Sequence, residues 1–66
     1  MLFFVIDYNH PAEGWIDALW ATGHRPFKVP DAKAAERHFA TLPESDQATH
    51  RYRRVEYGEF LNRGGV

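Results

Sequence analysis

The first strong signal in the chain is the segment 2–8, which reads LFFVIDY. Large and β-branched residues follow one another here without the polar alternation of a half-exposed strand, and Asn9, His10 and Pro11 end the run. A short apolar run bounded by turn residues is typical of a strand that is buried on both faces. We therefore predict that this segment is the central strand of a small sheet.

The material for a core is limited, because the chain has only 66 residues and no cysteine that could form a disulfide. A domain of this size buries only about 60% of the surface that its unfolded chain exposes. Ten aromatic residues are many for such a length, so some of them could lie at an interface, where aromatic residues are enriched. The alternative is that a small core simply uses large side chains to fill its space.

Residues 11–22 are compatible with two structures. Pro11 suits the first turn of a helix, and Gly23 stands where a left-handed C-terminal residue is expected. Gly14 would weaken this helix by about 1 kcal/mol relative to alanine. The alternative is a strand over residues 15–21, and the sequence leaves both possibilities open.

The clearest helix signal lies in the middle of the chain. Residues 25–29 alternate as a short strand, after which Asp31 offers a good N-cap side chain. The residues that follow are almost all strong helix formers, and Pro43 ends the helix. Ala35 and Phe39 lie on the stripe that is expected to face the sheet.

The last third of the chain is predicted as a polar loop over residues 42–48, a final strand over residues 49–57 and a frayed tail over residues 63–66. The apolar alternation of the final strand is imperfect, which indicates either a bulge or partial cover on both faces. Together the elements predict a single α+β domain over residues 1–66, with a three- to four-stranded sheet and one or two helices packed on one face.

Charge is distributed unevenly, although the net charge is only −1. Residues 1–23 contain three acidic side chains and no lysine or arginine, whereas all eight basic residues follow Gly23. This distribution predicts two faces of different sign. An exposed tryptophan beside carboxylates would be a suitable anchor on a basic protein surface. The alternative is that both tryptophans pack into the core against the phenylalanine rings. The candidate contact residues of the acidic face are Asp7, Glu13, Trp15, Asp17 and Trp20.

The segment 50–60, HRYRRVEYGEF, offers the opposite charge, and its candidate contact residues are Arg51, Arg53 and Arg54. Basic side chains interleaved with aromatic rings are what single-strand nucleic-acid binders use. Two glutamates in the same segment and the slightly negative net charge argue against a dedicated nucleic-acid domain. Arginines on an exposed strand also protect a sheet edge from pairing with other chains.

Neither a catalytic set nor a metal site is predicted. The four histidines lie in different predicted elements, none is spaced like a helical ligand pair, and we do not expect them to converge. The chain has no glycine-rich phosphate loop and no nucleophile motif, so we predict a protein that is not an enzyme and uses no cofactor. The apolar start is too short for a membrane span or a signal peptide, so we expect a cytoplasmic protein without a membrane partner.

The strand-into-helix unit of residues 26–42, PFKVPDAKAAERHFATL, the small size and the lack of cysteine together resemble the organisation of small phage-encoded inhibitors, including anti-CRISPR proteins. The resemblance implies action without catalysis, by masking a surface of a much larger host complex. It covers the organisation of the chain and carries over no functional residue.

These observations predict a non-catalytic protein-binding module, such as a phage-type inhibitor or an adaptor, whose partner is a larger protein or nucleoprotein complex. If that partner is a nuclease or a CRISPR effector, acidic side chains could imitate phosphates at its nucleic-acid site. The alternative is a small nucleic-acid-binding module that uses the arginine- and tyrosine-rich final strand. A half-exposed sheet in so small a domain could also pair with a second copy to form a homodimer.

Overall fold

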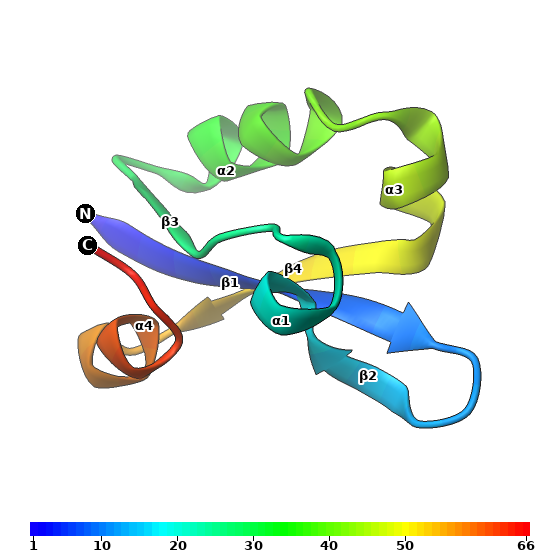
Figure 1. Cartoon of the computed structure of the whole chain (residues 1–66). Helices are drawn as coiled ribbons and strands as arrows, with labels where there is room; N and C mark the ends of the chain where they lie inside the picture. The colour runs from blue at the N-terminus through cyan, green and yellow to red at the C-terminus, as the bar shows by residue number, and fades with distance from the viewer.

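The computed structural model describes all 66 residues and shows a four-stranded antiparallel sheet with four short helices (Figure 1). In chain order the elements are β1 (Leu2–His10), β2 (Gly14–Asp17), α1 (Ala18–Thr22), β3 (Phe27–Val29), α2 (Ala32–Ala40), α3 (Glu44–Thr49), β4 (His50–Val55) and α4 (Tyr57–Asn62). The predicted α+β class is confirmed, with more helices than the one or two expected. None of the helices is long and apolar enough to cross a bilayer.

β1 is the central strand, as its apolar sequence predicts, because each of the other strands pairs with it. Asp7 and Tyr8 pair with both β2 and β4, while Phe3 and Phe4 pair with both β3 and β4. Since a strand has only two edges, β4 occupies one edge of β1. β2 and β3 lie end to end along its other edge. The outer edge of β4 has no strand beside it.

Two helices cover opposite faces of β1, whereas the sequence predicted helices on one face only (Figure 1). We call them the α2 face, to which the even-numbered residues of β1 point, and the α4 face, to which the odd-numbered residues point. The buried cluster of the α2 face consists of Phe4, Ile6, Ala18, Phe27 and Ala35. The buried cluster of the α4 face consists of Val5, Val55 and Phe60.

The segment 11–22 contains both of the predicted alternatives in succession. Gly14 has a φ of 78° at the end of the turn that follows β1, and β2 starts there. Asp17 is the N-cap of α1, and its Oδ1 accepts the backbone N–H of Leu19 at 3.0 Å. Gly23, with a φ of 81°, ends α1 as predicted. A helix over the whole segment is wrong, because the turn and the pairing of β2 with β1 take its first half.

The predicted helix in the middle of the chain is confirmed as α2. Asp31 is its N-cap, and Oδ1 of this residue accepts the backbone N–H of Ala34 at 2.8 Å. Ala35 is fully buried on the inward stripe. The ring of Phe39 lies 5.0 Å from the ring of Tyr52 in β4, so α2 packs on the sheet through this stripe.

The last third of the chain differs from the prediction in its helices. The predicted loop over residues 42–48 contains most of α3, and the final strand stops at Val55 because α4 follows it. β4 pairs with β1 in unbroken register, so there is no bulge. The imperfect alternation reflects two covered faces, since Tyr52 packs on the α2 face and Val55 on the α4 face.

The predicted frayed tail is also packed. Gly65 is buried, and its backbone N–H donates to the carbonyl oxygen of Phe60 at 2.9 Å. A Cβ at this position would lie 2.5 Å from the Phe60 ring, so the close approach requires glycine. Arg63 points back toward the sheet, where it contacts carboxylates.

Candidate functional site

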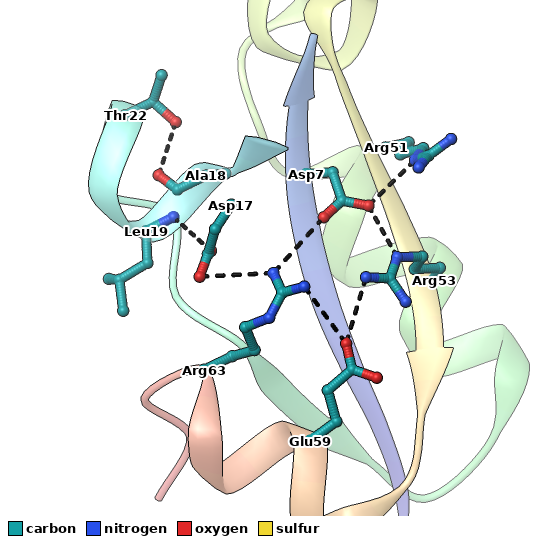
Figure 2. Close-up of polar contacts among 9 residues, drawn as sticks. All are labelled: Asp7, Asp17, Ala18, Leu19, Thr22, Arg51, Arg53, Glu59 and Arg63. Carbon is teal, nitrogen blue, oxygen red and sulfur yellow. Dashed lines mark hydrogen bonds and ion pairs between the residues drawn. The ribbon is translucent and has the colours of Figure 1, made fainter. Parts of the chain in front are cut away.

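Asp7 is the centre of a charged network on the α4 face (Figure 2). Its side chain is only 5% exposed, and its Oδ2 accepts hydrogen bonds from Nε of Arg51 at 3.1 Å and from Nε of Arg53 at 2.9 Å. Nη1 of Arg63 lies 4.0 Å from its Oδ1. A buried carboxylate is tolerated in a fold when cations pair with it and donors satisfy its oxygens, and these arginines meet that need.

Two further carboxylates complete the network (Figure 2). Oε2 of Glu59 lies 3.3 Å from Nη2 of Arg53 and 3.4 Å from Nη2 of Arg63. Oδ2 of Asp17 lies 3.5 Å from Nη1 of Arg63. Three arginines therefore meet three carboxylates, and the network has no net formal charge. It joins β1, β2, β4 and α4, so its first effect is to hold α4 against the sheet.

The hydrogen bond to Asp7 is the main cause that raises the pKa of the Arg53 guanidinium above its ordinary value, against a smaller lowering by burial. A basic group whose pKa is higher in the folded state than in the unfolded state stabilises the fold at every pH below its unfolded-state pKa. This stabilisation is lost only when the pH rises through the raised value. Arg53 therefore keeps its positive charge in the network throughout the physiological pH range.

The network corrects the prediction of two faces of different sign. The acidic residues Asp7 and Asp17 and the basic residues Arg51 and Arg53 lie on one side of the sheet and neutralise each other. Imitation of phosphates by these two aspartates would first require their ion pairs to break. Glu13, by contrast, is exposed in the turn after β1 and takes part in no ion pair.

The arginine- and tyrosine-rich strand β4 does not form one continuous basic surface. Arg54 pairs with Phe4 and lies exposed on the α2 side, opposite to Arg51 and Arg53. Tyr52 is partly buried, with its ring 5.7 Å from the ring of Phe4. The nucleic-acid interpretation assumed one row of free arginines and stacking rings. These side chains are instead divided between two faces of the sheet, and some of them are partly buried.

Both tryptophans are exposed. Trp20 in α1 has 88% of its surface exposed, and Trp15 in β2 has 43%. Cζ of Arg51 lies 4.3 Å from the centroid of the Trp15 ring, which is a cation–π contact. The alternative in which both indoles pack into the core is wrong, because Phe27 and Phe39 pack instead against Tyr52 and other core rings.

The surface contains no pocket that would enclose a small molecule. No protein-family model, curated protein or solved structure matches the chain. Function is therefore inferred from the exposed side chains and from the clusters that the fold brings together.

One such cluster was missed at the level of sequence. His24, which follows α1, and His50, which begins β4, have ring centroids 4.8 Å apart. Nε2 of His24 lies 2.9 Å from Oδ2 of Asp46 in α3. The expectation that the histidines would not converge is wrong for this pair, because α3 was predicted as a loop. The spacing of four residues between Asp46 and His50 was the only signal in the sequence.

Proposed function

We propose that the chain is a non-catalytic protein-binding module whose contact surface is centred on Trp20. The observation that carries this proposal is the 88% exposure of an indole on an ordered helix. Burial of a tryptophan removes on the order of 200 Å² from water, which is worth on the order of 5 kcal/mol before the costs of association. Tryptophan is also enriched among the residues that dominate binding energy at protein interfaces.

The helix that carries Trp20 is held in place, although it has only five residues. Ala18 is fully buried in the core of the α2 face, and its carbonyl oxygen accepts the backbone N–H of Gly23 at 2.9 Å. Asp17 caps the other end. A contact residue on a fixed backbone loses less conformational freedom on binding, so these contacts favour Trp20 as an anchor.

Trp15 and Arg51 offer a second pair of exposed side chains for contact with a partner. Each is exposed, and the guanidinium over the indole fixes both side chains relative to each other. Arginine and tryptophan are the residue types that, with tyrosine, most often anchor an interface. The partner that fits this chemistry is a larger protein with an apolar pocket for an indole.

The narrower proposal is that this contact inhibits a larger host complex by masking one of its functional surfaces, such as a nucleic-acid-binding site. It is supported by the organisation of the chain and by its exposed indoles. Since Glu13 is the one candidate acidic residue outside the charged network, we propose that masking relies on the tryptophans more than on imitation of phosphates.

The test is quantitative affinity capture from the native host with three immobilised proteins: the wild type, Trp20→Ser and the control Lys33→Ser. Lys33 is exposed on α2, on the other side of the sheet from the network. We expect a partner that the wild type and the control retain and that Trp20→Ser loses by tenfold or more, with equal thermal unfolding of all three proteins. Equal retention of every captured protein by Trp20→Ser would contradict the proposal.

Two solution measurements separate the other possibilities. Titration with single- and double-stranded oligonucleotides at two salt concentrations should show no binding; strong, salt-sensitive binding would instead favour the nucleic-acid alternative. Sedimentation of the wild type and Trp20→Ser should show monomers. A dimer that dissociates on substitution of Trp20 would identify a second copy as the occupant of the surface.

A further inference from the structure

We propose that His24, Asp46 and His50 form a binding site for a zinc ion, independent of the Trp20 surface. Each residue offers one metal-ligating atom, and these atoms all lie within 4.8 Å of one another. The residues come from the segment after α1, from α3 and from the start of β4, so the ion would join three separate parts of the chain. Two imidazoles and one carboxylate are a donor set that zinc binds well.

His50 is already oriented as a metal ligand. Its side chain is buried, and its Nδ1 lies 2.8 Å from the backbone carbonyl oxygen of Asp46. Since a carbonyl oxygen can only accept, Nδ1 carries the proton, and Nε2 presents its lone pair. A backbone carbonyl that fixes the tautomer in this way is the usual outer partner of a zinc-bound histidine.

The lone pair of His50 faces the segment that carries His24. Nε2 of His50 lies 2.8 Å from Oγ1 of Thr22, two residues before His24 in the chain. The hydroxyl of Thr22 also has the carbonyl oxygen of Ala18 as an acceptor, at 3.1 Å. Thr22 can therefore release His50 to a metal and still keep a hydrogen bond.

His24 and Asp46 form the accessible side of the proposed site. Nε2 of His24 donates to Oδ2 of Asp46 at 2.9 Å, because a carboxylate oxygen can only accept. Ligand atoms on a tetrahedral zinc ion are about 3.3 Å apart, given bond lengths of about 2.0–2.1 Å. The observed pair is already near this spacing, and zinc would replace the proton that the two atoms share.

The exposed fractions allow an ion to enter. The side chains of His24 and Asp46 are 20% and 35% exposed, so the carboxylate side of the cluster is open to solvent. Three protein ligands leave one tetrahedral position, which water would fill. We expect zinc to stabilise the fold, because it would bind the assembled site far better than the unfolded chain.

The test is calorimetric titration of zinc chloride into untagged, chelator-treated protein, followed by the same titration into His24→Asn and Asp46→Asn. Asparagine at position 46 keeps the shape of the side chain and an acceptor oxygen, which favours a folded variant. We expect one zinc ion per wild-type chain and a dissociation constant at least about tenfold larger in each variant. The control His38→Gln removes a histidine that stacks on Phe27 outside the cluster and should bind like the wild type.

A spectroscopic measurement covers the case in which a variant does not fold. Cobalt bound to the wild type should give the intense visible bands of a tetrahedral site. Magnesium, which prefers six oxygen ligands, should not bind. Absence of saturable zinc binding, a zinc affinity in both cluster variants equal to that of the wild type, or a weak octahedral cobalt spectrum in the wild type would each overturn the proposal.

Discussion

The two faces of β1 hold their helices in different ways. On the α2 face, Ala35 of α2 packs with four other buried apolar residues from the sheet and α1. On the α4 face three buried apolar residues occupy one end, and the network of arginines and carboxylates occupies the other. Ile6 and Asp7 show the contrast best, since they are neighbours with 2% and 3% exposure, yet one contacts apolar side chains and the other three guanidinium groups.

The difference shows how a short chain with a small buried core can cover both sides of its central strand. Apolar packing is non-directional and needs enough area, which α2 and its stripe provide. α4 has only six residues and one fully buried side chain, Phe60. Ion pairs and hydrogen bonds of fixed geometry supply the remaining attachment, from Glu59 within α4 and from Arg63 just after it.

The largest expected effect comes from Asp7→Asn. The substitution removes the central negative charge and turns an amide group toward cations, so we expect a loss of about 2–4 kcal/mol in the free energy of unfolding. This is a large part of the roughly 3–10 kcal/mol expected for a domain of this length. Urea denaturation followed by circular dichroism measures it.

Ile6→Val is the matched control for Asp7→Asn, because it alters the adjacent residue on the other face. We expect a loss of about 0.5–1.5 kcal/mol that does not depend on salt. The loss in Asp7→Asn should shrink toward about 1 M salt, where the Debye length is about 3 Å. Equal salt dependence in the two variants would show that the faces are not held in different ways.

The next effect concerns the glycines around α4. Gly65→Ala would place a Cβ 2.5 Å from the buried ring of Phe60, and we expect a loss of about 1–3 kcal/mol. Gly58→Ala, within α4, meets nothing within 4 Å and should gain about 0.5–1 kcal/mol through helix propensity. Thermal unfolding of both variants is the measurement, and a neutral Gly65→Ala would show that the tail does not pack on α4.

The smallest effect is expected from Arg51→Lys. Lysine lacks the Nε donor that bonds Asp7 and stacks less well over Trp15, so the loss should be about 0.5–1 kcal/mol. The tryptophan fluorescence of the folded protein should change as well. Arg54→Lys, on the other face of the same strand, should leave both the stability and the fluorescence unchanged.

The fold could be predicted where local patterns were strong. The unbroken apolar run of β1 and the capped sequence of α2 led to correct elements. The sequence of α4, YGEFLN, contains a glycine and is too short to be helical by propensity alone. Its helix depends on contact between Phe60 and the rings on β1, such as Phe3 at 5.0 Å, which no local pattern reveals.

The candidate sites, like the fold, could be predicted only where local patterns revealed them. Exposure of the tryptophans was one of two alternatives that the sequence left open, because the core of so small a chain cannot hold every large ring but the sequence does not say which rings it holds. The two arginines that hydrogen-bond Asp7 lie 44 and 46 residues along the chain, so only the pairing of β1 with β4 brings them to it. His24 and Asp46 meet in the same way, 22 residues apart, through a helix that the sequence did not reveal.

The dependence of every strand on β1 also bears on how the protein is made. β1 is synthesised before its partners, and Arg51 follows Asp7 by 44 residues. Until β4 leaves the ribosome, the nascent chain carries an apolar strand with one edge unpaired and a carboxylate without its cations. The sheet cannot be completed until most of the chain has been translated, and we expect the intermediate to be prone to aggregation until then.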